Sequence, residues 1–182
     1  MEENLIILSS INDRWDKDLS ITLSRDQKLP DVLHVFLKGR IDAYNAEFFQ
    51  DRLNKIYLHG FVRLVFRCSS LDYVASAGLG VFASEYQKFT QKGGLFVFFG
   101  LQPKVLDVFQ ILGFAKLFCI AKELKDVDYF LNNADKVQKK VFPLSFCCPI
   151  CDKRLNTTKS GRFRCANCRT IISVSETGEV SF

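Results

Sequence analysis

The sequence predicts an α/β domain with a largely parallel sheet, followed by a small segment that folds around a metal ion. The first prediction rests on short apolar runs that alternate with longer segments of helical periodicity, as strands alternate with the helices that connect them. The second rests on two Cys-x-x-Cys pairs near the C-terminus. Hydrophobic residues make up 48% of the 182 residues, which is enough to build a folded core.

The expected strands and helices alternate through most of the chain. Residues 5–8 are either a short strand or an apolar lead-in, and residues 19–23 and 32–37 predict strands on either side of a Pro30-Asp31 turn. A helix with one apolar face runs from about 43 to 58 and ends at Gly60. The remaining expected elements are strand 62–66, a helix to about 91, strand 95–99, a helix opened by Pro103 and capped by Gly113, strand 117–121 and a helix from 124 to about 140.

The stretch from residue 71 to residue 80 connects the third strand to its helix, and we expect the function to centre on it. Ser76 falls where the helix begins, so free first-turn amides and the positive end of the helix dipole lie beside it. Gly78 and Gly80 allow a partner to approach the backbone closely. Ser76 is therefore interpreted either as a helix N-cap or as a position that accepts a phosphate or an anionic partner.

Several short motifs in a fixed order give the chain a resemblance to a known family. They are Gly39-Arg40-Ile41-Asp42-Ala43, Ser76-Ala77-Gly78-Leu79-Gly80, Gly93-Gly94, Pro103-Lys104-Val105 and Leu112-Gly113-Phe114. Together they resemble the STAS domain, and most closely the bacterial anti-sigma factor antagonists, over roughly residues 19 to 135. The resemblance implies a mixed sheet with helices packed mainly on one face. It also implies binding to a serine kinase that acts as an anti-sigma factor.

The same resemblance implies a set of site residues. The serine that is phosphorylated in that family corresponds to Ser76, and the acidic residue beside it corresponds to Asp42. The implied partner surface consists of Asp42, Ser76, Ala77, Gly78 and Leu79. This chain has Ala75 and Arg67 at two positions where the family carries aspartate. If Arg67 points to the same edge of the sheet as Ser76, we expect it to pair with the phosphate.

The C-terminal segment carries a metal-binding pattern. Cys148-Pro-Ile-Cys151 and Cys165-Ala-Asn-Cys168 form C-x2-C-x13-C-x2-C, and each pair presents two thiolates to one point. We predict one structural Zn²⁺ held by Cys148, Cys151, Cys165 and Cys168 in a zinc ribbon, with short antiparallel strands near 161–164, 170–174 and 178–182. The predicted organisation is a STAS-like domain at 1–135, a linker at 136–146 and the ribbon at 147–182. Cys68 and Cys119 are expected in the core.

The function classes that follow are those of a binding protein. The chain shows no nucleotide-binding motif, nucleophile–base pair or carboxylate dyad, and His34 and His59 lack a plausible catalytic companion. We therefore predict no enzyme, but an anti-sigma factor antagonist-like module switched by phosphorylation at Ser76. The alternatives are a transcription-complex or nucleic-acid adaptor acting through the ribbon, and an unphosphorylated STAS scaffold or transporter-complex subunit.

Charge and hydropathy bound the partners and the compartment. The formal charge of +5 falls to about +3 once four thiolates and one Zn²⁺ are counted, which does not by itself predict nucleic-acid binding. The apolar runs are too short to cross a bilayer, and the first residues lack a signal-peptide pattern. Because the cysteine spacing indicates metal rather than disulfides, we expect a cytoplasmic protein.

Overall fold

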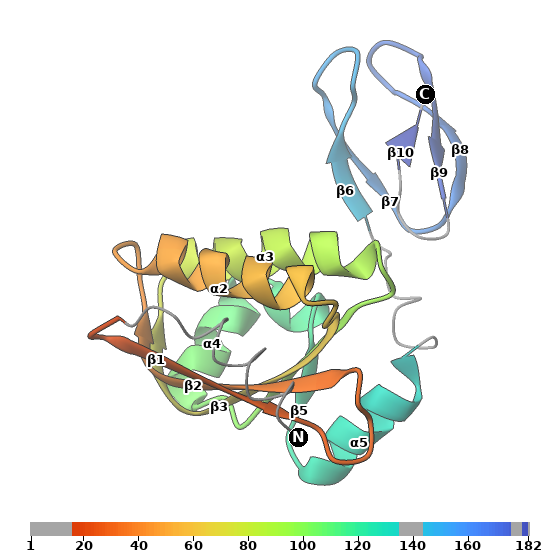
Figure 1. The fold of residues 1–182 in the computed structure, drawn as a ribbon. Helices are drawn as coiled ribbons and strands as arrows, with labels where there is room; N and C mark the ends of the chain where they lie inside the picture. The colour runs from red at the N-terminus through yellow and green to blue at the C-terminus, as the bar shows by residue number, and fades with distance from the viewer. Residues whose placement is uncertain (1–15, 135–143, 176–179, 182) are drawn as a thin grey trace. The chain divides into compact units, whose positions relative to one another are not determined.

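The computed structural model describes residues 16–134, 144–175, 180 and 181 (Figure 1). The chain divides into two compact units, Met1–Ala134 and Asp135–Phe182. The expected strand at residues 5–8 and the last turns of the helix expected to reach residue 140 lie outside the described residues. In the described parts of the chain, no helix is both long enough and apolar enough to span a bilayer.

The first unit is built on a five-stranded mixed sheet in the order β1-β2-β3-β4-β5. β1 (Leu19–Arg25) runs antiparallel to β2 (Val32–Ile41). β3 (Arg63–Val74), β4 (Leu95–Phe99) and β5 (Cys119–Ala121) follow in parallel. The predicted mixed sheet is confirmed.

Helices cover the two faces of this sheet unequally. α2 (Ala46–Leu58) and α3 (Ser76–Thr90) lie side by side on one face (Figure 1). α4 (Pro103–Ile111) packs against β3, and the short 3₁₀ helix η1 (Phe114–Lys116) follows it. α5 (Leu124–Asn132) packs against β4 and β5, and it shares a pocket with side chains on the other face of the sheet. The predicted arrangement, with helices mainly on one face, is also confirmed.

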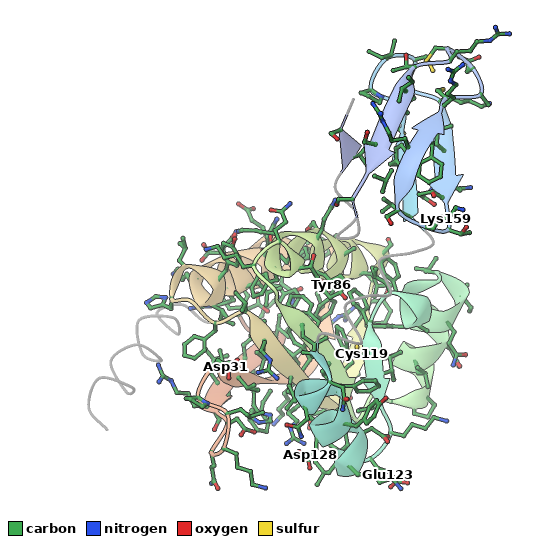
Figure 2. All side chains as sticks on the ribbon, turned by 90° about the vertical axis from the view of Figure 1, so that its right-hand side faces the viewer. Asp31, Tyr86, Cys119, Glu123, Asp128 and Lys159 are labelled. Carbon is green, nitrogen blue, oxygen red and sulfur yellow. The ribbon has the colours of Figure 1, made fainter. Side chains whose placement is uncertain are left out.

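Phenylalanine rings fill the space between the sheet and α3. Phe66 of β3 stacks on Phe98 of β4 with ring centroids 4.9 Å apart and meets Phe82 of α3 edge to face at 5.1 Å. All three side chains are fully buried. Tyr86 of α3 also faces the sheet, where burial, with the nearby Cys119 thiol, raises its pKa to about 12 (Figure 2). The apolar face that the sequence predicts for this helix therefore forms the centre of the core.

β3 is much longer than the sequence predicted. The apolar run that indicated a strand covers residues 62–66, whereas the strand continues to Val74. Its second half alternates buried Cys68 and Leu71 with exposed residues such as Ser70, and it keeps pairing with β2 as far as Ile41 opposite Val74. The stretch from residue 71 to residue 80 is therefore divided between the end of β3 and the start of α3, and a single residue, Ala75, connects the two elements.

The second unit consists of two small antiparallel sheets. β6 (Leu144–Cys147) pairs with β7 (Arg154–Thr157) in a hairpin that the sequence did not predict, and β6 begins inside the segment assigned to the linker. β8 (Gly161–Arg164), β9 (Ile171–Val174) and β10 (Val180–Ser181) form the other sheet. The buried cluster of this second unit contains Cys148, Cys165, Ile172 and Val174.

Candidate functional site

The first candidate site is the N-terminus of α3, where two parallel strands end together. Ile41 pairs with Val74, and the Ala75 amide donates to the Ile41 carbonyl at 2.8 Å. The helix begins at once, because the Leu79 amide donates to the Ala75 carbonyl at 3.0 Å. The amides between these two residues therefore point out of the helix end without a helical acceptor.

Ser76 is the first residue of α3 and is exposed to solvent. The N-cap position belongs to Ala75, which makes no side-chain cap bond, so the interpretation of Ser76 as an N-cap is wrong. The Ser76 hydroxyl forms no hydrogen bond within the described part of the chain. The first turn also contains no acidic side chain, so nothing there offsets the positive end of the helix dipole.

Asp42 lies at the same end of the sheet, directly after β2. Its Oδ1 accepts a hydrogen bond from the Tyr44 amide at 2.9 Å, and its Oδ2 lies 3.1 Å from the Arg40 guanidinium. The Asp42 side chain is only 16% exposed. Asp42 therefore fixes the turn before α2 and holds an ion pair with Arg40 at this end of the sheet.

The two glycines of α3 have different roles. A Cβ on Gly78 would lie 2.5 Å from Ile41 Cγ2 and 3.2 Å from Val74 Cγ1, so this glycine lets the helix pack closely on the strands. Leu79 is fully buried in the core. These two predicted partner residues are therefore not on the surface, since both face the sheet. Gly80 is exposed with open space around it, and it lies one turn after Ser76 on the same side of the helix.

Arg67 does not lie at this end of the sheet. It pairs with Phe36 and Phe99, and the seven residues of strand that lead from it to Val74 span roughly 23 Å. The expected pairing of Arg67 with a phosphate on Ser76 is therefore excluded. Its Nε instead donates to His34 Nδ1 at 3.3 Å.

The second candidate site is the cluster formed by Cys148, Cys151, Cys165 and Cys168. The four sulfurs all lie within 4.8 Å of one another, and the pairs Cys148–Cys168 and Cys151–Cys165 are 3.6 Å apart. Four sulfurs at about 2.3 Å from one tetrahedral ion lie about 3.8 Å from each other. The cluster therefore has the spacing of a tetrahedral metal site and is far too open for disulfides. The four cysteines can hold a metal ion.

Matching backbone turns present the two cysteine pairs. The Cys148 amide donates to the Lys153 carbonyl, and the Cys165 amide donates to the Thr170 carbonyl, both at 2.9 Å. Asp152 and Arg169 occupy equivalent positions with φ of 56° and 61°. Burial raises the pKa of the Cys148 thiol to about 11, whereas hydrogen bonds with the side chain and then the backbone of Thr170 lower the pKa of Cys168 to about 6.

A comparison with protein families matches residues 25–127 to the STAS domain. That match covers more than half of the chain. The chain belongs to the STAS family. Residues 146–182 match a family described only as a domain of unknown function (DUF8512).

Two proteins and one solved structure are similar to the STAS domain of this chain. An anti-sigma-B factor antagonist of Listeria monocytogenes is 26% identical over 63% of this chain and 96% of its own length. A Bordetella bronchiseptica protein, described as a candidate anti-sigma factor antagonist and named BtrV, is 34% identical over 52% of this chain and 81% of its own length. The crystal structure of an anti-sigma factor antagonist from Mycobacterium paratuberculosis has the same fold, with a TM-score of 0.56 at 20% identity, covering 63% of this chain and 95% of that one.

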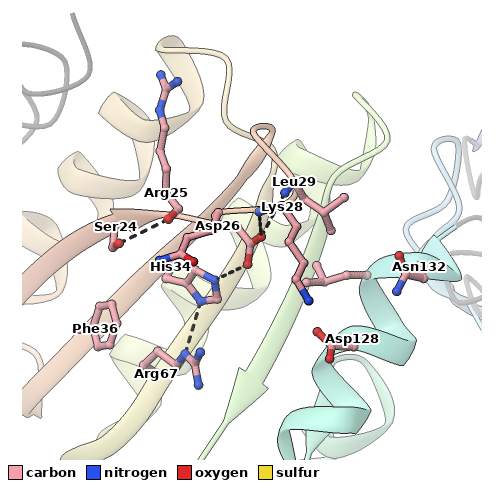
Figure 3. Close-up of a pocket in the computed structure, with 12 residues that line it drawn as sticks. Ser24, Arg25, Asp26, Lys28, Leu29, His34, Phe36, Arg67, Asp128 and Asn132 are labelled. Atoms are coloured by element: carbon pink, nitrogen blue, oxygen red, sulfur yellow. Dashed lines mark hydrogen bonds and ion pairs between the residues drawn. The ribbon is translucent and has the colours of Figure 1, made fainter. Parts of the chain in front are cut away.

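One polar cluster of the STAS domain was missed by the sequence reasoning. His34 does have an ionisable companion, because its Nε2 lies 2.8 Å from Asp26 Oδ2 (Figure 3). Burial alone raises the pKa of Asp26, but hydrogen bonds with His34 and with the amides of Lys28 and Leu29 outweigh it and hold that pKa below its ordinary value. Pairing the first two predicted strands as a hairpin would have placed Asp26 near His34 and so indicated this contact.

Proposed function

We propose that this chain is a non-enzymatic regulatory protein that acts as an anti-sigma factor antagonist. Its STAS domain binds a serine-kinase anti-sigma factor through the surface at the start of α3, and phosphorylation of Ser76 releases that partner. The names of the Listeria and Bordetella relatives support the general role. The observation that carries the proposal for this chain is the exposed Ser76 hydroxyl on an uncapped helix N-terminus.

The helix end favours the phosphorylated product. A phosphoserine carries close to two negative charges, and such a charge beside a helix N-terminus is stabilised by about 0.3–1 kcal/mol when it is exposed. Ala75 places no carboxylate next to the phosphate, and Asp42 is already paired with Arg40. For the partner, the same step replaces a neutral contact by a dianion, which weakens an interface formed around the unmodified serine.

Phosphorylation can be tested with the partner kinase and ATP, followed by mass spectrometry. We expect phosphate on Ser76 of the wild type and none in Ser76→Ala. Ser84→Ala is the matched control, because Ser84 is an exposed serine on the same helix. Ala75→Asp restores the residue implied by the family and is expected to be phosphorylated faster. Phosphate that persists in Ser76→Ala, or an unmodified wild type beside an active kinase, would leave the chain as an unswitched STAS scaffold.

The partner surface can be tested separately from the switch. Gly80→Trp adds bulk to an exposed position one turn from Ser76 without meeting any neighbouring atom at its Cβ. We expect this variant to lose kinase binding while its far-UV circular dichroism stays normal. Lys104→Trp adds the same bulk at an exposed position in the first turn of α4 and should bind normally. Equal binding by both variants would place the interface elsewhere.

For the cysteine cluster, we propose one structural Zn²⁺ that stabilises the ribbon. The all-sulfur donor set, the tetrahedral spacing and the two buried cysteines support this assignment. A closed Cys₄ site leaves no position for a substrate, so the metal contributes folding energy rather than chemistry.

A second candidate function is a nucleic-acid adaptor that acts through the ribbon. It is favoured by Arg162 and Arg164 of β8, which are both exposed, and by the exposed Lys159 nearby (Figure 2). This function predicts salt-dependent binding to single-stranded or duplex oligonucleotides that weakens in Arg162→Ser. A lack of binding at low salt would eliminate it.

A further inference from the structure

A polar pocket opens on the face of the STAS sheet that α2 and α3 leave uncovered. It has a volume of about 490 Å³ and lies between the β1–β2 turn, strands β2 and β3, and α5 (Figure 3). Cavities of this size hold small molecules. The side chains that matter here are Lys28, His34, Phe36, Arg67, Asp128 and Asn132.

Arg67 is held in place on two sides. Its Nε donates to His34 Nδ1 at 3.3 Å, and its guanidinium carbon lies 4.9 Å from the centre of the Phe99 ring. The two terminal nitrogens form no hydrogen bond or ion pair with the described residues. Figure 3 shows this end of Arg67 facing the space between His34 and Asp128. A guanidinium fixed in this way presents a planar pair of donors that matches a carboxylate.

The Asp26 carboxylate already has hydrogen-bond partners on both of its oxygens. Asp26 accepts hydrogen bonds from the Lys28 amide at 2.8 Å and the Leu29 amide at 3.0 Å, and its other oxygen pairs with His34. Because Nδ1 of His34 accepts from Arg67, the ring proton lies on Nε2 and is donated to Asp26. Asp26 therefore orients the histidine, and the histidine orients Arg67.

The opposite wall of the pocket has a different chemistry. Asp128 and Asn132 lie one turn apart on α5 and are both exposed at the pocket. Phe36, which is 43% exposed, provides an apolar surface on the sheet. A ligand whose anionic group binds Arg67 therefore meets the side-chain oxygens of Asp128 and Asn132 on the opposite side of the pocket. The Asp128 carboxylate favours an amino or hydroxyl group at the other end of the ligand.

We propose that this pocket binds a small amino acid or hydroxy acid, whose carboxylate takes the free edge of Arg67 and whose amino or hydroxyl group faces Asp128. A phosphate monoester, whose two negative charges would face Arg67 and Lys28, is the competing ligand in the test. The site lies toward the start of β2, whereas Ser76 follows the end of β3. It therefore gives the STAS domain a ligand input separate from its proposed partner surface.

Thermal shift assays and titration calorimetry on the full chain test this assignment. The probes are the proteinogenic amino acids, lactate, malate, acetate, glycerol phosphate and inorganic phosphate, each at millimolar concentration. We expect at least one amino or hydroxy acid to bind and to raise the melting temperature. Arg67→Lys keeps the charge but removes the planar donor pair, so it should weaken that binding at least tenfold. Asp128→Asn should reduce the preference for the same ligand over acetate.

Arg25→Lys is the matched control. Arg25 also borders the pocket and carries the same side chain, but its guanidinium lies over Phe61 at 4.8 Å and points away from the pocket (Figure 3). This variant should bind the ligand as the wild type does. Because Asp128 is an exposed residue of α5, Asp128→Asn keeps the test valid even if Arg67→Lys folds poorly. The assignment is overturned if no amino or hydroxy acid binds, if a folded Arg67→Lys protein binds equally well, or if the phosphates bind in preference.

Discussion

In the STAS domain, phenylalanine rings of β3, β4 and α3 pack against one another at centroid distances near 5 Å, whereas the buried cluster of the ribbon consists of two cysteines, Ile172 and Val174. Full burial of one large apolar side chain contributes about 1.5–3 kcal/mol. The first unit contains many such side chains, but the second contains few. The two units therefore depend on different sources of folding energy.

The two units are therefore expected to be sensitive to different changes. The ribbon has few buried apolar side chains to offset the entropy of ordering its chain, so we expect its stability to depend on the proposed Zn²⁺. The STAS domain depends on close packing, which makes it sensitive to small changes of volume at contacts such as the one between Gly78 and Ile41.

The largest expected effect is the loss of ribbon structure when the metal is removed. We expect metal analysis to give one zinc per chain, and a strong chelator to unfold residues 147–182. All five tyrosines of the sequence lie between residues 44 and 129, so tyrosine fluorescence reports on the STAS domain and should not change. Amide NMR spectra recorded with and without chelator would show both outcomes.

Cysteine variants sharpen this prediction. Cys165→Ser removes one of the four clustered sulfurs and should abolish stoichiometric zinc, whereas Cys147→Ser alters an exposed neighbour of Cys148 and should retain it. Full zinc content in Cys165→Ser would remove that residue from the site. Loss of tyrosine signal on chelation would show that the two units do not fold independently.

Two glycines of α3 test the packing of the STAS domain. Gly78→Ala forces a Cβ to within 2.5 Å of Ile41 and should lower the free energy of unfolding by about 1–3 kcal/mol. Gly80→Ala meets no atom and should raise it by roughly 0.5–1 kcal/mol through helix propensity. Urea denaturation followed by tyrosine fluorescence measures both. Equal effects of the two substitutions would contradict the close contact.

Much of the fold could be predicted because burial repeats with the period of each element. The run at 62–66 indicated a buried strand, and the spacing of Leu79, Phe82 and Phe89 indicated one face of a helix, as the structure shows. The cysteine spacing likewise predicted four sulfurs around one point. These signals are local in the sequence, which is why one chain suffices to detect them.

What the sequence did not predict depends on contacts between distant residues. The second half of β3 contains exposed residues, such as Ser70 and Asp72, between its buried ones. It therefore lacks the continuous apolar run of a fully buried strand. Gly78 was interpreted as a surface residue because its neighbour Ile41 comes from another strand. The proposed ligand site depends on the register that places Arg67 between Phe36 and Phe99.

A smaller effect is expected at the two turns of the ribbon. Arg169 and Asp152 hold positive φ angles, a conformation that costs most side chains roughly 1–2 kcal/mol and glycine almost nothing. Arg169→Gly should therefore make zinc harder to remove, and Asp152→Gly should do so less, because aspartate tolerates this conformation better. Zinc retention against increasing chelator measures the difference. A loss of affinity in Arg169→Gly would indicate that its side chain contributes more than its backbone costs.

The smallest expected effect concerns Asp26, and we expect it at neutral pH but not at acidic pH. Because its pKa in the folded domain lies below the ordinary 3.8, ionised Asp26 stabilises the fold above that pH, and this contribution disappears as the pH falls through the lowered value. Asp26→Asn keeps an oxygen for the two amides but loses the charge beside His34. At neutral pH the variant should be less stable by under about 1 kcal/mol, since the side chain is partly exposed. Urea denaturation of both proteins at pH 7 and near pH 3, followed by tyrosine fluorescence, should show the two stabilities converging in acid. A stability difference that persists unchanged at the lower pH would mean that Asp26 acts through shape rather than charge.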